Sequence, residues 1–284
     1  MTILVEEKPI IAPQKKRKLE LPFALGSTPF VWQIIFFYIP IILMSVTSLF
    51  KISSIGTIEG LTLEHFHEVL SPVYFSVIGN SIALALGAAF FCLAIAFPVA
   101  HFMATRGKKY KNILLFFLII PFWTNFLLHV CAWYFVLERE GFLNMILMKI
   151  GLISTPLHFL NSPFSMMLMM IYYFLPFMIL PIYASLDRFN YDLIEASRDL
   201  GANSFQTFSR VLLPVTLPAI RAGFFLVFIP AFGEFVIPEL MGGDKYYFVG
   251  NVISQYILGQ STGPLGAAFT VLASASLIFC GLLC

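Results

Sequence analysis

The chain has 284 residues, of which 59% are hydrophobic and only 11% are charged, and its formal net charge at pH 7 is +2. The mean hydropathy is +0.89. Soluble domains carry about 25% charged residues, so this composition excludes a soluble globular protein and indicates an integral membrane protein.

The hydropathy pattern predicts six membrane-spanning helices, because one span needs about 20 mostly apolar residues. Backbone groups in lipid must hydrogen-bond within the protein, and segments this long and apolar do so as helices rather than as barrel strands. The expected fold class is therefore all-α, with a polytopic membrane domain over 30–284 after an N-terminal cytoplasmic segment, 1–29. The expected spans are 30–50, 74–104, 112–137, 164–186, 219–241 and 265–284.

Basic residues in the short loops predict the orientation, since cytoplasmic loops carry an excess of Lys and Arg. They cluster before the first span, between the second and third, and between the fourth and fifth. These residues are Lys15, Lys16, Arg17, Lys18, Arg106, Lys108, Lys109, Lys111, Arg188, Arg198, Arg210 and Arg221. Both termini and the loop 187–218 are therefore expected in the cytoplasm. The first span is too long for a secretory signal peptide, and we interpret it as a retained helix.

The loop 187–218 predicts two short helices joined by a glycine corner. Leu193, Ala196 and Leu200 recur at helical spacing and share one face of the first helix. Gly201 follows at the position where a left-handed residue ends a helix at low cost. Asn203 then starts the second helix, because Gln206 three residues later completes a capping-box pattern.

The second short helix carries its own apolar face, formed by Phe205, Phe208 and Leu212. Pro214 and Pro218 are expected to stop this helix and to start the fifth span. The two apolar faces either pack on the cytoplasmic end of the bundle itself or fit a groove on a soluble partner. Helix-in-groove docking uses this spacing of anchors, which favours the partner.

The same loop resembles the EAA loop of ABC importer permeases, whose pattern is Glu-Ala-Ala, three residues, Gly, nine residues, then Ile-x-Leu-Pro. The residues at the family positions are Glu195, Ala196, Gly201, Leu213 and Pro214, with Ser197 and Val211 as departures. The resemblance implies a type I importer permease whose loop docks on a separate ATPase subunit. We expect the docking residues to be Glu195, Ala196, Gly201, Phe205, Phe208, Leu213 and Pro214.

That family also implies the partners: a pair of ABC ATPase subunits, a second related permease and a soluble substrate-binding protein, at a bacterial inner membrane. The chain itself contains no GxxxxGK[ST] nucleotide motif, so we expect a transporter subunit rather than an enzyme. The four cysteines lie in apolar spans and form no metal motif. We therefore expect no catalytic residue, no cofactor, no metal and no nucleic-acid partner.

Four further stretches resemble the polyamine (spermidine/putrescine) permeases of the PotB and PotH type. They are 121–125, 233–238, 240–243 and 250–253, with the sequences PFWTN, GEFVIP, LMGG and GNVI. The resemblance implies polyamine import by alternating access. Permeases for sulfate, iron or phosphonate are the near alternatives, and a stand-alone ion-coupled transporter using Glu234 is a more distant one.

Glu234 is the leading candidate for the substrate pathway. It lies 13 residues beyond Arg221, which places it about 20 Å along a continuous helix and inside the bilayer. An ionisable group at that depth marks a pathway or a paired site, whereas the alternative is a carboxyl bonded to a neighbouring helix. Trp123, Asn125 and Tyr173 are further candidates, because aromatic ring faces attract organic cations.

Overall fold

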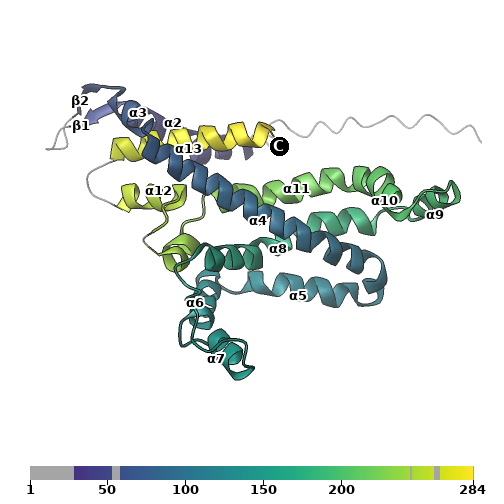
Figure 1. Ribbon diagram of the computed structural model, residues 1–284. Coiled ribbons are helices and arrows are strands. Elements are labelled where there is room, and N and C mark those ends of the chain that lie inside the picture. Colours follow the sequence, from purple (N-terminus) through teal and green to yellow (C-terminus); the bar gives the residue numbers. More distant parts are fainter. Residues whose placement is uncertain (1–28, 53–57, 244, 259–262, 284) are drawn as a thin grey trace, which may run out of the picture. The chain divides into compact units, whose positions relative to one another are not determined.

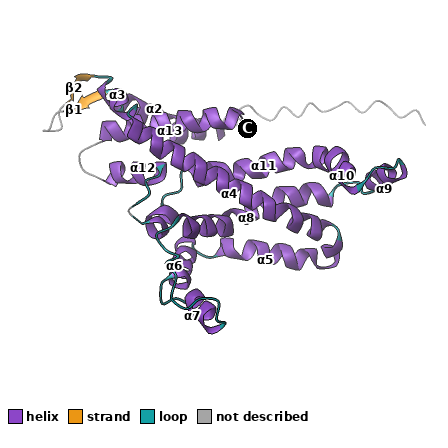
Figure 2. Ribbon diagram, viewed as in Figure 1, coloured by secondary structure: helices purple, strands orange, loops and turns teal. Residues whose placement is uncertain are grey.

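The structure is a computed structural model that describes residues 29–52, 58–243, 245–258 and 263–283. Its contacts divide the chain into two compact units, Met1–Val46 and Thr47–Cys284. Helices dominate the described part of each unit (Figure 2). Apart from its last residue, the predicted cytoplasmic segment 1–29 lies outside the described residues.

The described part of the first unit belongs to an apolar helical run, Pro29–Thr47, whose last residue falls in the second unit and which is long enough to cross a membrane. It passes through a π-helical turn, η1 (Ile34–Tyr38), before the regular helix α2 (Ile39–Thr47). Pro40 lacks the backbone N–H that a regular helix would use, and the π-turn directly before it absorbs that interruption. The expected first span, 30–50, is therefore confirmed over most of its length.

In the second unit, the other long helices are α4 (Pro72–Ala104), α8 (Pro163–Asp187), the run Ser204–Phe232 and α13 (Gly263–Leu283). With the run in the first unit, five described helices are long and apolar enough to span a membrane, and a bent pair of helices raises this number to six. The predicted all-α polytopic fold is thus confirmed (Figure 1).

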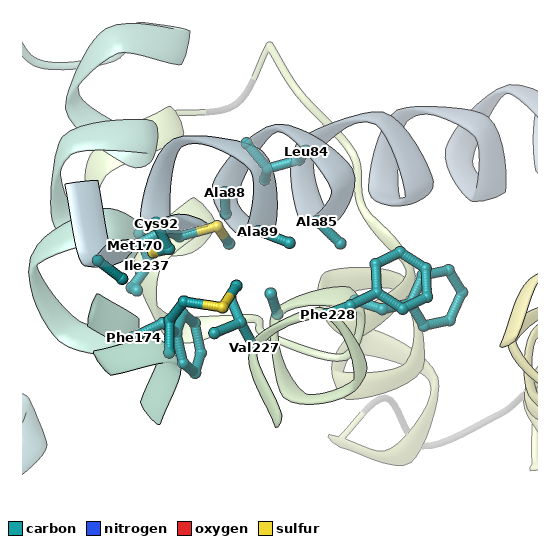
Figure 3. Close-up of a cluster of buried hydrophobic side chains, with 14 of the residues drawn as sticks. Leu84, Ala85, Ala88, Ala89, Cys92, Met170, Phe174, Val227, Phe228 and Ile237 are labelled. Atoms are coloured by element: carbon teal, nitrogen blue, oxygen red, sulfur yellow. The ribbon is translucent and has the colours of Figure 1, made fainter. Parts of the chain in front are cut away.

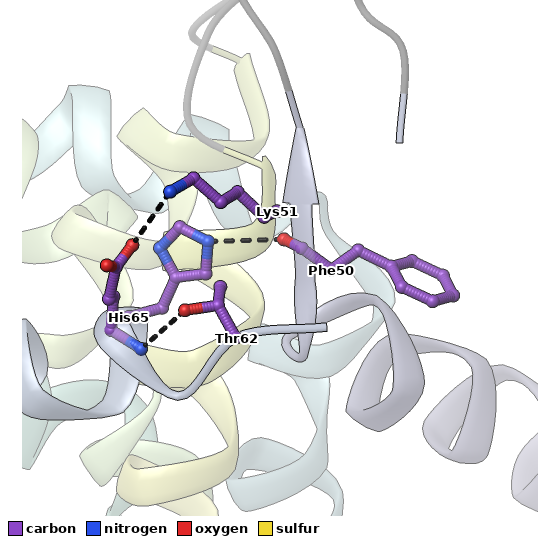
Figure 4. A network of polar contacts seen from close by, with 5 residues as sticks. Phe50, Lys51, Thr62 and His65 are labelled. Atoms are coloured by element: carbon purple, nitrogen blue, oxygen red, sulfur yellow. Dashed lines mark hydrogen bonds and ion pairs between the residues drawn. The ribbon is translucent and has the colours of Figure 1, made fainter. Parts of the chain in front are cut away.

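The shorter elements of the second unit lie between and beside the long helices. Among them are β1 (Phe50–Ile52), β2 (Ile58–Leu61), α3 (Glu64–Val69), η2 (Arg106–Tyr110), α7 (Phe142–Lys149) and α12 (Val249–Leu258). The two strands form an antiparallel hairpin. Polar contacts join it to α3 (Figure 4): Lys51 Nζ lies 3.6 Å from a Glu64 carboxylate oxygen, and His65 Nε2 lies 3.2 Å from the Phe50 carbonyl.

The core of the second unit is built by α4, α8 and α11 (Leu213–Phe232), which pack against one another. The buried face of α4 consists mainly of small residues, which allow helix backbones to approach closely. Figure 3 shows Ala85 and Ala89 of α4 on the side that looks towards Val227 and Phe228 of α11, and all four residues are buried. Small residues on one helix and large ones on its neighbours therefore interdigitate.

The expected third span, 112–137, is a bent pair of helices rather than one continuous helix. The chain forms α5 (Lys111–Trp123) and α6 (Phe126–Leu137), and the run is bent by 94° at the break. Thr124 is extended and its hydroxyl donates to the Pro121 carbonyl at 2.9 Å. Asn125 caps α6 by accepting from the Leu127 N–H at 2.8 Å. The side chains of Thr124 and Asn125 thus hydrogen-bond to backbone groups that would have bonded to other backbone groups in a continuous helix.

The expected boundary between the second short helix and the fifth span was wrong. The run Ser204–Phe232 is continuous through a π-helical turn, η3 (Phe208–Leu212), and Pro214 and Pro218 lie inside it. A π-turn widens the helix just before Pro214, which makes room for the proline ring without ending the helix. At its other end the span stops at Phe232 rather than at residue 241.

Candidate functional site

The predicted glycine corner is present. Helix α9 (Asp192–Asp199) has Leu200 as its C-cap, and Gly201 follows with φ of 82°. The Gly201 N–H donates to the Arg198 carbonyl at 2.8 Å and the Ala202 N–H to the Ser197 carbonyl at 3.0 Å. This pair of bonds is the Schellman arrangement, which requires a left-handed residue at the position of Gly201.

The predicted capping box is present as well. The Gln206 N–H donates to Asn203 Oδ1 at 2.8 Å, and the Asn203 N–H donates to Gln206 Oε1 at 2.9 Å. These bonds start α10 (Ser204–Thr207). The hydroxyls of Ser197 and Thr207 lie 2.9 Å apart, so the two short helices are hydrogen-bonded to each other across the corner.

The two apolar faces of the loop have different surroundings. Leu200 is 88% exposed and Phe205 is 76% exposed. Phe208, in contrast, lies edge-on against Phe97 of α4 with ring centroids 5.5 Å apart, and Leu212 is buried. The predicted common face of the second helix is therefore split, because η3 turns its later residues towards the bundle and leaves Phe205 in the open.

A hollow of about 430 Å³ lies beside the exposed corner. Its lining residues are Ser197, Leu200, Gly201, Ala202, Gln206, Arg210 and Val211. Glu195, Ala196 and Pro214 are exposed nearby along the chain, and Leu213 is half-buried. The loop thus exposes the apolar side chains of Leu200 and Phe205, the Glu195 carboxylate and a concave surface.

The base of this loop is tied to the neighbouring helices. Lys111 Nζ, at the start of α5, lies 3.7 Å from an Asp187 carboxylate oxygen at the end of α8. The Tyr191 hydroxyl donates to the Leu186 carbonyl at 3.3 Å. Burial, and to a lesser degree the Asp187 carboxylate, raise the pKa of Tyr191, so its hydroxyl remains a neutral donor at physiological pH.

A second candidate site surrounds Glu234. The sequence predicted this residue on a continuous helix, but it lies in a non-helical segment between α11 and the π-turn η4 (Pro238–Gly242). Its carboxylate oxygen Oε1 accepts from the Val236 N–H at 2.9 Å and from the Ile237 N–H at 3.4 Å. The carboxylate therefore caps the start of the next helical segment.

Glu234 also lines a cavity of about 510 Å³ between α8 and α11. The other lining residues are Tyr173, Phe174, Phe177, Phe225, Leu226, Ile229 and Pro230. One acidic residue therefore lines a largely apolar and aromatic space. Sequence reasoning named only Glu234 and Tyr173 here, although the helical spacing of Tyr173, Phe174 and Phe177 on α8 is a signal that could have identified the aromatic face of that helix.

The four pathway candidates do not share one site. Tyr173 and Glu234 line the same cavity, whereas Trp123 and Asn125 lie at the break between α5 and α6 and are not among its lining residues. Trp123 is 74% exposed. Asn125 acts as the cap of α6.

His129 belongs to a polar network at the same break. Its Nδ1 lies 2.9 Å from the Tyr172 hydroxyl on α8, and its Nε2 lies 3.0 Å from the Pro121 carbonyl. Thr124 is a third partner. This network joins the broken span to α8.

Comparisons with known proteins agree with this architecture. Residues 96–283 match the family described as "Binding-protein-dependent transport system inner membrane component". The spermidine/putrescine transport system permease protein PotB of Escherichia coli K12 is 37% identical over 84% of this chain and 88% of its own length. PotB of Haemophilus influenzae is 38% identical over 85% of each chain.

A solved structure supports the fold. A bacterial alginate ABC transporter, crystallised in complex with a periplasmic protein bound to an alginate pentasaccharide, contains a chain that superposes with a TM-score of 0.72. The similarity covers 93% of this chain and 92% of that one, at 18% sequence identity.

Proposed function

Because this chain belongs to the family of binding-protein-dependent transport system inner membrane components, and is a permease subunit of an ABC importer, we propose that it carries polyamines such as spermidine and putrescine into the cell. It is a multi-pass inner-membrane protein and a transporter subunit rather than an enzyme. The PotB relatives, at 37% and 38% identity over most of the chain, support this solute class.

The observation that carries the proposal is the carboxylate of Glu234 in an aromatic cavity. Polyamines are slender alkyl chains that carry several ammonium groups at neutral pH. A carboxylate attracts such a cation more strongly in a poorly hydrated site than in bulk water. The rings of Tyr173, Phe174, Phe177 and Phe225 offer cation–π faces and apolar contact to the methylene groups between the charges.

The rim of the cavity argues for the second permease. Leu226 and Ile229 line it and are each 50% exposed. A carboxylate beside an open apolar rim is unfavourable against lipid, so such a site needs protein cover. We assign that cover to a second related permease, which would enclose the solute between the two chains.

The corner around Gly201 is the docking element for an ABC ATPase subunit. Leu200 and Phe205 would be the apolar anchors in a groove of that subunit, and the hollow beside them would receive one of its side chains. This assignment requires residues 187–218 on the cytoplasmic side. Counting basic residues gives that orientation and puts both termini in the cytoplasm as well.

The continuous helix Ser204–Phe232 links the two sites mechanically. It has 29 residues, or about 43 Å at 1.5 Å per residue, and it runs from the corner to the residue before Gly233. Closure of the two ATPase subunits on ATP would shift the corner, and this helix would carry the shift to the Glu234 cavity. Solute delivered at the outer face by a soluble binding protein would then move inward by alternating access.

Two substitutions at Glu234 test the solute site. Glu234→Gln keeps an oxygen that accepts from Val236 and Ile237 but removes the charge, so uptake of labelled spermidine should fall at least about tenfold. Glu234→Asp keeps the charge and should retain part of the uptake. Glu59→Gln, which removes an exposed charge in β2, is the control and should transport normally.

A purely structural carboxyl predicts the reverse order of damage. Gln would then be tolerated through its hydrogen bonds, and Asp would be worse because it is one methylene shorter. Wild-type uptake by Glu234→Gln, normalised to membrane abundance, would remove Glu234 from the solute site.

A further inference from the structure

Glu234 stands on a backbone segment that has little regular structure of its own. Helix α11 ends at Phe232, residues 233–235 are non-helical, and helical backbone resumes at Val236, directly before η4. The Glu234 side chain hydrogen-bonds to the N–H groups of Val236 and Ile237 at the start of that helical run. The position of its carboxylate is therefore set by whatever holds this backbone in place.

The first turn of α12 lies directly against that segment. A Cβ atom on Gly250 would stand 2.6 Å from the Gly233 carbonyl oxygen and 2.7 Å from the Glu234 carbonyl oxygen. Both are backbone atoms, so they cannot swing aside as a flexible side chain would. Only glycine allows α12 to approach the break this closely.

Asn251 ties the two ends of the segment together. Its side chain is 4% exposed, and Nδ2 donates to the Phe235 carbonyl at 3.3 Å and to Glu239 Oε2 at 2.6 Å. One amide thus bridges the residue after Glu234 and the first turn of η4. Two acceptors face this nitrogen, which fixes the orientation of the amide.

The start of α12 is itself fixed to the core. The Val249 N–H donates to the buried Ser81 hydroxyl of α4 at 2.8 Å. A chain of direct contacts therefore runs from α4 through the first turn of α12 to the Glu234 segment. Helix α12 therefore packs against the backbone that carries the Glu234 side chain.

We propose that Gly250 and Asn251 are positioning residues for polyamine transport, which hold the Glu234 carboxylate at the place in the cavity where it meets the solute. The inference rests on the proposed role of Glu234. It adds that the motif at 250–253 acts through the carboxylate rather than by contacting the solute.

A double-mutant cycle tests this inference, with uptake of labelled spermidine by cells that carry the whole transporter as the measurement. Asn251→Ala should reduce uptake about tenfold in the wild-type background, because a carboxylate displaced by about an ångström loses most of its effect. In the Glu234→Asp background the carboxylate is already displaced. There, the same substitution should cost less than about threefold.

Asn144→Ala is the matched control. Asn144 is also fully buried, and its amide bonds to Leu157 at 2.9 Å in both directions, but it does not line the cavity. Any fold-reduction in spermidine uptake that Asn144→Ala causes should be the same in the wild-type and Glu234→Asp backgrounds. All values are normalised to the abundance of the assembled complex.

The outcomes separate the two proposals. If Asn251→Ala costs the same factor with Glu234 and with Asp at that position, Asn251 is merely structural and the inference is wrong. If Glu234→Gln transports at the wild-type rate, the role of Glu234 fails first. If the Asn251→Ala complex does not assemble, Asn251→Asp replaces it in the test. The new carboxylate would repel that of Glu239, so uptake should fall. Adding Glu239→Gln removes this repulsion and should raise uptake several-fold above that of Asn251→Asp alone. Absence of that rescue would also contradict the inference.

Discussion

The corner at Gly201 and the break after Phe232 both interrupt helical chain at a candidate site, yet they are stabilised by different means. Every hydrogen bond that shapes the corner joins residues within ten positions of each other. The break is held by Asn251, which is 16 positions from Phe235, and by Ser165, whose hydroxyl donates to the Met241 carbonyl 76 positions away. Local hydrogen bonds shape the first interruption, whereas the second combines the local bonds of Glu234 to the Val236 and Ile237 N–H groups with contacts to distant segments.

The two interruptions suit different functions. A locally stabilised corner keeps its shape while it moves as a unit, which suits an element that docks on a partner. A break held by distant segments changes when those segments move, which suits a site that must respond to helix motion.

The largest effect is expected at the corner itself. No atom lies within 4 Å of a Cβ built on Gly201, so a substitution there is penalised only through its φ of 82°. Gly201→Val should reduce uptake by more than about tenfold and abolish stimulation of the ATPase by loaded binding protein, because β-branched residues are strained at positive φ. Gly201→Asn should lose about threefold or less, since Asn tolerates this conformation.

Normal ATPase stimulation in purified Gly201→Val complex would refute the local account of the corner. Equal damage from Asn and Val would indicate that the partner needs the open space at this position rather than the backbone conformation.

A smaller effect is expected from a pair of glycines near the break. A Cβ on Gly250 would meet backbone carbonyls, whereas a Cβ on Gly242 would stand 2.6 Å from Met166 Sδ, which is part of a flexible side chain. Gly250→Ala should therefore lower spermidine uptake several-fold, and Gly242→Ala less than about twofold. Equal uptake by the two variants would mean that the backbone at the break gives way easily, and would weaken the case for tertiary anchoring.

The same contrast explains what the sequence could predict. Hydropathy gave most of the long helices because lipid imposes one length and one composition on every span. The Gly201 corner and the capping box of Asn203 and Gln206 were predicted because their hydrogen bonds connect near neighbours in sequence.

The errors lie where distant contacts or unusual helix turns decide the structure. Pro214 looked like a helix start, but the π-turn before it keeps the helix continuous. The sequence did not indicate that Asn125 caps α6, at a break that Thr124 and Pro121 also stabilise. The aromatic lining of the cavity was missed because its residues come from two helices that only the fold brings together.

The most direct test of the proposed function is transport by the purified complex in proteoliposomes. ATP is enclosed on the side of residues 187–218, and binding protein with labelled spermidine is added on the other. We expect spermidine to move to the ATP side only when ATP and binding protein are both present, with putrescine competing and sulfate or phosphonate not competing. Movement driven by an ion gradient without ATP, or equal competition by sulfate, would contradict polyamine import by this permease.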